Sequence, residues 1–193
     1  MGRKNLAETR INEILDAFED CIIKNGFDYC SLEQIAIHAN MKRSIIRHYI
    51  GNKDELLKAM VKRFINNYQQ EIKFGISLLR KEKLITELLK DIFKTGSSTN
   101  DEIIIAALWA KQEHNSDIKK LLQKFYSDLE QVFADTLKHS FPKASKTKID
   151  NTAYILLCLM DSHSSMLALN LKTAKTNTLY NLATKLVAEL NND

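Results

Sequence analysis

The sequence predicts an all-α protein of about nine helices, in which a small three-helix domain precedes a larger helical domain. Three observations predict this fold class. The 193 residues include one proline and five glycines, so few positions break a helix. Valine, isoleucine and threonine never alternate for long with polar residues, as they do in half-buried strands. Apolar residues recur instead with the spacing of amphipathic helices along most of the chain.

The composition excludes several other classes of protein. Hydrophobic residues make up 45% and charged residues 27% of the chain, as in ordinary globular proteins. No apolar run approaches the ~20 residues that span a bilayer, and the N-terminal MGRKNLAETR lacks the apolar stretch of a signal peptide. The three cysteines, Cys21, Cys30 and Cys158, have no metal-binding spacing and fit the core of a reduced protein. We expect a cytoplasmic protein that does not enter a membrane.

The first two predicted helices have recognisable ends. Gly26 stops the first helix, because glycine takes a left-handed conformation without a steric penalty. Ser31 begins the second helix and forms a capping box with Gln34, three residues later. Asn40 ends this helix, since asparagine tolerates the left-handed conformation. The apolar positions of the first helix lie on one face, at Ile11, Ile14, Leu15, Phe18 and Ile22.

The third predicted helix is short and basic. It lies in the stretch MKRSIIRHYIGNKDEL, where Ile46 and Tyr49 form part of an apolar side and Gly51 ends the helix. Residues 38–53 contain no aspartate or glutamate, so this segment carries an excess equal to the net charge of +4 of the whole chain. The basic residues of the segment are Lys42, Arg43, Arg47 and Lys53.

The rest of the chain predicts longer helices. Asn52 and Glu55 form the capping residues of the fourth helix. We expect the remaining helices at residues 54–80, 83–95, 101–114, 116–140, 146–171 and 176–191. Breaks are expected at 81–83, in the GSSTN loop at 96–100, at 115–116, around 141–142 and near 172–175. We place the domain boundary between residues 1–53 and 54–193.

Two short helices joined by a tight turn form a helix-turn-helix, whose second helix fits the major groove of DNA. Ile46 and Tyr49 would hold this helix to its neighbours. The outward side chains would be Arg43, Ser44, Ile45, Arg47 and His48. A basic helix face is also typical of solvated surface. The alternative is therefore a helical module that binds proteins or anionic surfaces without sequence-specific DNA binding.

The segment SLEQIAIHANMKRSIIRHYIGNKDELLKAM resembles the DNA-binding domain of the TetR family of transcriptional repressors. The resemblance covers about residues 9–63. Ser31 stands where the family has a Thr or Ser, and Ile35-Ala36 matches its Ile-Ala pair. Residues 39–41 replace the Ala-Gly-Val turn. The two remaining matches are His48-Tyr49-Ile50, for the usual His-Tyr-Phe, and Asn52-Lys53-Asp54-Glu55-Leu56, for the run that opens the fourth helix.

Two departures from the family bear on DNA recognition. Lys42 stands where the family commonly has a serine that caps the recognition helix, so we expect Lys42 to contact a phosphate instead. Arg47 replaces a frequent tyrosine and can fork onto a guanine edge or a phosphate. Lys53 is expected at a phosphate, and Tyr49 packs with its hydroxyl at the DNA backbone. The DNA-binding candidates are Ser31, Lys42, Arg43, Ser44, Ile45, Arg47, His48, Tyr49 and Lys53.

The last two predicted helices are candidates for a dimer interface. Residues 153–171 begin with a stretch that is apolar nearly all round, and the final helix has a leucine stripe. The stripe consists of Leu179, Leu182, Leu186 and Leu190. TetR-like proteins pair two such helices from each chain, which implies a homodimer on a palindromic operator. The alternative is that both helices pack only in the core of their own chain.

The resemblance also implies a small-molecule pocket in the larger domain and a repressor that the ligand releases from DNA, although some members activate or need a corepressor. Polar residues within apolar stretches are the best hints, although aromatic residues are more often core. The ligand-binding candidates are Trp109, Glu113, Phe125, Asp161 and His163. The five scattered histidines form no catalytic or metal motif, and no glycine-rich phosphate loop occurs. We expect no enzyme activity, metal or cofactor.

Overall fold

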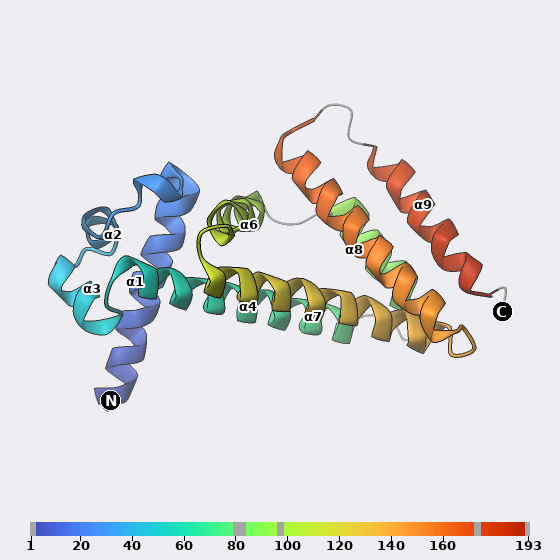
Figure 1. Cartoon of the computed structure of the whole chain (residues 1–193), viewed down its shortest axis with the longest axis horizontal. Helices are drawn as coiled ribbons and strands as arrows, with labels where there is room; N and C mark the ends of the chain where they lie inside the picture. Colours follow the sequence, from blue (N-terminus) through green and yellow to red (C-terminus); the bar gives the residue numbers. More distant parts are fainter. Residues whose placement is uncertain (1–2, 79–83, 96–98, 172–174, 192–193) are drawn as a thin grey trace. The chain divides into compact units, whose positions relative to one another are not determined.

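The computed structural model describes residues 3–78, 84–95, 99–171 and 175–191. These residues form nine α-helices joined by turns, and they contain no strand (Figure 1). The prediction of an all-α protein is therefore confirmed. None of the described helices is both long enough and apolar enough to span a bilayer.

The chain divides into two compact units. One unit comprises Met1–Tyr68 and Ile103–Leu122, and the other comprises Gln69–Glu102 and Gln123–Asp193. Helices α4, α6 and α7 run from one unit into the other, so this division does not follow the chain in sequence. The boundary that we expect after residue 53 stays a prediction.

The first unit begins with the predicted helix-turn-helix. Its elements are α1 (Arg3–Asn25), a 3₁₀ turn (Phe27–Tyr29), α2 (Leu32–His38), α3 (Arg43–Tyr49) and the start of α4 (Lys53–Leu78). Helices α1, α2 and α3 pack against one another. The apolar faces that define them are buried at this meeting point, where Phe18, Ile35 and Ile46 have no exposed surface. Their burial holds the two short helices in place.

The ends of these helices follow the predicted local chemistry. Gly26 has φ 77° after α1, and Asn40 has φ 49° after α2. The Ser31 hydroxyl accepts from the Gln34 N–H at 3.2 Å, and the Ser31 N–H donates to Gln34 Oε1 at 3.0 Å. At the start of α4, Asn52 Oδ1 accepts from the backbone N–H of residue 55 at 3.0 Å. All four predicted ends are confirmed.

An arginine fastens α4 to α1 within the first unit. Arg63 lies 2.7 Å from Asp16 and 2.8 Å from Glu19, and it also donates to the Asn12 carbonyl at 3.2 Å. Its side chain is only 16% exposed. Because a partly buried guanidinium needs such partners, the three α1 groups fix the position of this part of α4.

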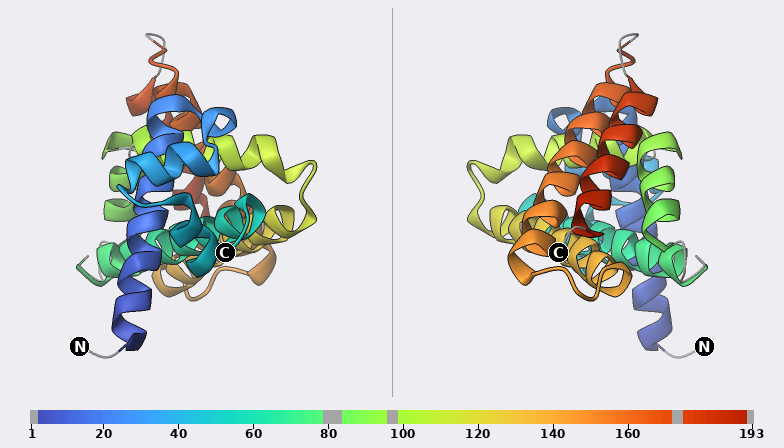
Figure 2. Two further views of the ribbon diagram at one scale, coloured as in Figure 1. Left: turned by 90° about the vertical axis from the view of Figure 1, so that its left-hand side faces the viewer. Right: turned by 90° about the vertical axis from the view of Figure 1, so that its right-hand side faces the viewer.

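The second unit is built from helices of the later chain. Its elements include α5 (Leu84–Lys90), a π-helical turn (Asp91–Thr95), α8 (Lys146–Ala168), α9 (Thr176–Ala188) and a final 3₁₀ turn (Glu189–Asn191). Helices α8 and α9 lie side by side (Figures 1 and 2). Helix α9 also packs against α5 and the π-helical turn.

The long helices match the predicted ranges closely; α6 is shifted by two residues, and α9 ends at Ala188 with a 3₁₀ turn to residue 191. Two further differences have a structural description. Helix α8 ends at Ala168 rather than at residue 171, because Asn170 adopts a left-handed conformation with φ 52°. The helix expected over 83–95 is α-helical only to Lys90 and continues as the π-helical turn. The breaks expected at 81–83, at 96–98 of the GSSTN loop and at 172–174 lie outside the described residues.

The predicted turn joins helices α6 and α7. Helix α6 spans Thr99–Gln112, and α7 spans Ser116–Ser140. Asn115 caps α7, since its Oδ1 accepts from the N–H groups of Asp117 and Ile118 at 3.1 Å. The break near Pro142 also appears, between α7 and α8. Both predicted breaks are confirmed.

Replacing Gly51 by alanine should destabilise the fold by about 1–3 kcal/mol. Gly51 has φ 105°, and an added Cβ would lie 1.9 Å from Glu55 Oε2. That oxygen accepts from the Asn52 N–H at 2.8 Å, so moving it aside breaks the cap of α4. Denaturant unfolding measures the loss.

Gly75→Ala is the matched control for this substitution. Gly75 lies within α4, and an added Cβ there meets nothing within 4 Å. Alanine should stabilise the helix at this position by about 0.5–1 kcal/mol. Equal effects of the two substitutions on the free energy of unfolding would contradict the strain that we assign to Gly51.

Candidate nucleic-acid interface

Helix α3 owes its position to packing rather than to its own stability. It has seven residues, far fewer than an isolated helix needs in water. Ile46, its one fully buried side chain, anchors it. Lys42 occupies the N-cap position and makes no capping hydrogen bond, as expected where lysine replaces serine. Lys42 therefore does not stabilise the start of this helix, which is consistent with a functional role for the residue.

The outward face of α3 is basic. Arg43, Arg47 and His48 are exposed, and Tyr49 is half-buried. The His48 ring meets the Tyr49 ring edge-on, with 5.1 Å between their centroids. Ser44 and Ile45 complete the predicted outward set, with Ser44 exposed and Ile45 half-buried. The structure thus brings the predicted α3 residues together on one surface.

A hollow of about 560 Å³ lies on this surface. It is lined by Arg10, Asn40, Met41, Lys42, Ser44, Ile45, His48 and Tyr49. Arg10 comes from α1, and sequence reasoning missed it. Its signal in the sequence is weak, because one arginine on the polar side of an amphipathic helix is ordinary. The fold is what places this guanidinium beside the recognition helix.

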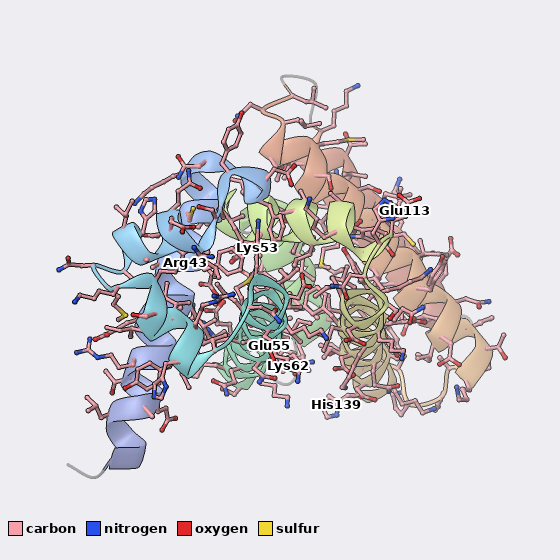
Figure 3. All side chains as sticks on the ribbon, turned by 60° about the vertical axis from the view of Figure 1, so that its left-hand side comes forward. Arg43, Lys53, Glu55, Lys62, Glu113 and His139 are labelled. Atoms are coloured by element: carbon pink, nitrogen blue, oxygen red, sulfur yellow. The ribbon has the colours of Figure 1, made fainter. Side chains whose placement is uncertain are left out.

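Two arginines of this surface carry carboxylate partners. Arg43 pairs with Glu33 of α2, and it lies between the α2 and α3 ribbons (Figure 3). Arg10 pairs with Glu13 at 2.6 Å. No carboxylate of the described residues lies within ion-pair distance of Lys42 or Arg47. The surface therefore combines unpaired and paired cations.

The Ser31 hydroxyl is already used within the protein. It accepts a backbone N–H in the capping box, and it keeps its own hydrogen for a further acceptor such as a phosphate. Its role as a DNA contact stays a prediction.

Lys53 lies over an aromatic ring in this structure. Its Nζ is 4.8 Å from the centroid of Phe27, and Nζ of Lys111 from α6 is 4.8 Å from the same centroid. Lys111 also pairs with Asp28 at 2.5 Å. The hydrogen bond from Lys111 holds the pKa of the Asp28 carboxyl below its usual value, and the charge of Lys53 adds to this. The predicted phosphate contact of Lys53 stays a prediction.

The ligand-binding candidates fall in different compact units. Trp109 of α6 and Glu113, which follows α6, belong to the first unit. Trp109 is 48% exposed, and Glu113 is also exposed. Phe125, Asp161 and His163 belong to the second unit, where Phe125 is buried. The structure therefore groups three of the five candidates in one unit.

Asp161 and His163 are polar groups within the apolar part of α8. The Asp161 carboxylate accepts from the Tyr126 hydroxyl at 2.8 Å. The His163 ring is 2% exposed, and its centroid lies 6.0 Å from that of Phe93. Its Nε2 lies 3.5 Å from the Thr176 hydroxyl, while Nδ1 has no partner among the described residues. A buried nitrogen without a partner costs about 1–3 kcal/mol.

The prediction that the cysteines are core residues holds for two of the three. Cys21 and Cys30 are buried, whereas Cys158 is exposed on α8, so the prediction is wrong there. Burial raises the pKa of the Cys30 thiol to about 12, with a further contribution from the neighbouring Cys21. Such a thiol stays protonated at neutral pH and is a poor nucleophile. The described residues contain no cluster of His, Cys, Asp or Glu side chains that could hold a metal ion.

Comparison with known proteins finds transcriptional regulators similar to this chain. A family model described as bacterial regulatory proteins, tetR family, matches residues 14–60. The nicotine-responsive transcriptional repressor HdnoR of Paenarthrobacter nicotinovorans is 25% identical over 162 residues, which cover 80% of this chain and 81% of that protein. The transcriptional regulator BetI of Serratia proteamaculans is 24% identical over 147 residues, or 71% of this chain and 73% of that protein.

Solved structures share the fold over nearly the whole chain. A TetR transcription regulator from Haloarcula marismortui has a TM-score of 0.80 at 13% identity and covers 94% of this chain and 98% of its own. A transcriptional regulator from Saccharomonospora viridis, solved in complex with choline, has a TM-score of 0.77 at 14% identity. That match covers 94% of this chain and 96% of the regulator.

Proposed function

Because residues 14–60 place this chain in the tetR family of bacterial transcriptional regulators, we propose that it is a ligand-responsive repressor. It binds a palindromic operator as a homodimer, and a small molecule releases it. Residues 1–53 form the DNA-binding domain, and residues 54–193 bind the effector and the second subunit. The observation that carries the proposal is α3, a basic helix whose start lacks a side-chain cap and whose outward face is exposed.

The exposed side chains of α3 suit two kinds of DNA contact. Lys42 and Arg43 at the start of the helix can neutralise phosphates, which supplies affinity for any duplex. Arg47, further along the exposed face, can fork onto a guanine edge, which supplies sequence preference. A helix that binds a protein or an anionic surface would need no such preference. Sequence-specific binding therefore separates the proposal from that alternative.

Arg47→Ala and Lys42→Ala should each weaken operator binding without unfolding the protein. The loss is about 1–3 kcal/mol if Arg47 forks onto a base, and Lys42→Ala should reduce the salt slope by about one. Selection of bound fragments from genomic DNA supplies the operator, and fluorescence anisotropy at several salt concentrations measures both quantities.

Lys143→Ala is the matched control, since Lys143 is an exposed lysine in the turn between α7 and α8. It should leave operator affinity and salt slope unchanged. Unchanged affinity in both α3 variants would remove this helix from the interface.

An exposed apolar face on α8 and α9 supports the homodimer. Leu169 and Leu182 are 72% and 50% exposed. The other large apolar side chains exposed on α8 are Tyr154, Ile155 and Met166. Apolar surface gathered in this way is typical of a protein interface. A second copy that covers it would form a four-helix bundle with two-fold symmetry, which matches a palindromic site.

The leucine stripe of the last helix serves two purposes in this proposal. Leu190 is buried within its own chain, and so are Ala183 and Val187. Leu182 points away from that core, and Leu179 and Leu186 are half-buried. Part of the stripe therefore stabilises the subunit, which is the alternative that the sequence left open. The exposed part remains for a partner.

The double substitution Ile155→Glu and Leu182→Glu should convert the dimer to a monomer, because charges do not enter an apolar interface without large desolvation costs. Light scattering after size exclusion measures the mass of the particle. Operator affinity should fall in parallel, since each half-site is then bound separately.

Phe74→Glu is the control for this prediction. Phe74 on α4 is 66% exposed, comparable to the substituted residues, but it does not lie on α8 or α9. The variant should stay dimeric. A double variant that remains dimeric would show that another surface joins the subunits.

We place the effector beside Asp161 and His163. The Asp161 carboxylate, which contacts Tyr126 of α7, and the unpartnered His163 Nδ1 are polar groups on an apolar helix, and a small-molecule site combines such groups with apolar side chains. The name of one relative specifies a response to nicotine, and one solved neighbour binds choline. An organic cation is accordingly the class of effector to screen first, since Asp161 supplies a negative charge and neighbouring Tyr126 an aromatic ring.

Asp161→Asn should raise the effector concentration needed for operator release by about tenfold or more. Asparagine can still accept from the Tyr126 hydroxyl, so the change removes charge while it retains the hydrogen bond that links α8 to α7. Release of labelled operator by a panel of organic cations, followed by anisotropy, measures the shift.

Tyr126→Phe is the complementary control, because it removes the hydrogen bond and keeps the carboxylate. Thermal unfolding is recorded for both variants. If Asp161→Asn lowers only thermal stability and leaves the effector response intact, Asp161 has a structural role.

A further inference from the structure

Two ion pairs beside the outward face of α3 place carboxylates where DNA is expected to approach. Arg43 of α3 pairs with Glu33 of α2, and Arg10 of α1 pairs with Glu13 at 2.6 Å. All four side chains are roughly half exposed. Arg10 and the N-terminal part of α3 line the same hollow. The two glutamates therefore lie beside cations that a phosphate backbone would also attract.

The fold has little need of these two pairs. Exposed ion pairs contribute about 0–1 kcal/mol to stability. Glu33 lies in the first turn of α2, where a negative charge is mildly favourable, but the Ser31–Gln34 capping box already secures this helix start. Arg63 provides the contrast, since its largely buried guanidinium has three α1 partners and fastens two helices together.

We propose that Glu33 and Glu13 hold Arg43 and Arg10 in the free protein, and that operator binding exchanges these carboxylates for DNA phosphates. Arg10 is then a further DNA contact, contributed by α1 and additional to those on α3. The inference rests on the proposed function of α3 as the recognition helix. It names the residues that compete with the DNA for the arginines.

The exchange makes the glutamates determinants of specificity. An arginine paired with a carboxylate brings no net charge to the duplex, and so it adds little to the counterion release that drives non-specific binding. The pairs open only when α3 docks deeply enough to offer each arginine a phosphate or a base edge in good geometry. The cost of breaking the pairs therefore falls mainly on operator binding, so Glu33 and Glu13 lower operator affinity more than affinity for unrelated DNA.

Glu33→Gln and Glu13→Gln test the exchange, because glutamine keeps the shape of the side chain and removes its charge. Each substitution should raise operator affinity by about two- to fivefold, because the pair no longer has to be broken when the operator binds. On a scrambled duplex the salt slope should steepen by about one, because one more cation becomes available to phosphates. Affinity for the scrambled duplex should rise less than operator affinity, so the ratio of specific to non-specific affinity increases.

Two further variants make the test specific. Asp20→Asn adds the same charge by breaking the exposed Lys24–Asp20 pair of α1, neither residue of which lines the hollow, and it should change neither ratio nor slope. Arg10→Ala should weaken operator binding, reduce the salt slope by about one and cancel the effect of Glu13→Gln in a double-mutant cycle.

The outcomes separate this inference from the function on which it rests. Weaker operator binding by Glu33→Gln would mean that Glu33 positions Arg43 for DNA, and changes equal to those of Asp20→Asn would mean a simple charge effect. Either result overturns the exchange. If the unsubstituted protein prefers no fragment over the scrambled duplex and Arg47→Ala changes nothing, the proposed function itself fails.

Discussion

The position of the outward face of α3 depends on the burial of one side chain, Ile46. Helix α3 is too short to persist alone and begins without a side-chain cap, so its orientation comes from the contact of Ile46 with the core of the first unit. Left-handed residues on both sides, Asn40 and Gly51, fix where α3 begins and ends. Because Ile46 is the one fully buried residue of α3, its outward side chains can differ without loss of core packing. Under the proposed function, those side chains contact DNA.

Within the first unit, helices α2, α3 and α4 are all attached to α1. Its apolar face packs against α2 and α3, and its polar face supplies the carboxylates and the carbonyl that bind Arg63 of α4. The Lys111–Asp28 and Lys58–Asp117 pairs add attachments from α6 and α7. Charged contacts thus link α4 to α1, α6 to the 3₁₀ turn and α7 to α4, in addition to the buried apolar side chains of these helices. Charged contacts at a surface can be exchanged at low cost, as the proposed response to an effector would require.

The sequence was most informative where the chemistry is local. The capping boxes at Ser31 and Asn52, and the left-handed turns at Gly26 and Asn40, depend on residues within a few positions of one another and could be predicted. The Arg43–Glu33 pair could not, because Glu33 lies on another helix, and neither could the place of Arg10 beside the hollow, which exists only in the folded unit. The leucine stripe shows a second limit. Its period identifies a helix face, but only the fold separates inward Leu190 from outward Leu182.

Among the described residues of the second unit, one buried side-chain atom has no hydrogen-bond partner. Buried hydroxyl groups can bond within their own helix, as Thr136 does to the Val132 carbonyl at 2.8 Å. A histidine ring cannot do so through both nitrogens, and His163 Nδ1 is the buried side-chain atom left without a partner among the described residues. Burial of that nitrogen without a hydrogen bond costs free energy. A molecule that bonds to it therefore gains more free energy than one that bonds to a group already hydrogen-bonded within the protein. Under the proposed function, this atom gives an effector a reason to stabilise one arrangement of α8, which is the physical requirement for a ligand to shift a conformational equilibrium.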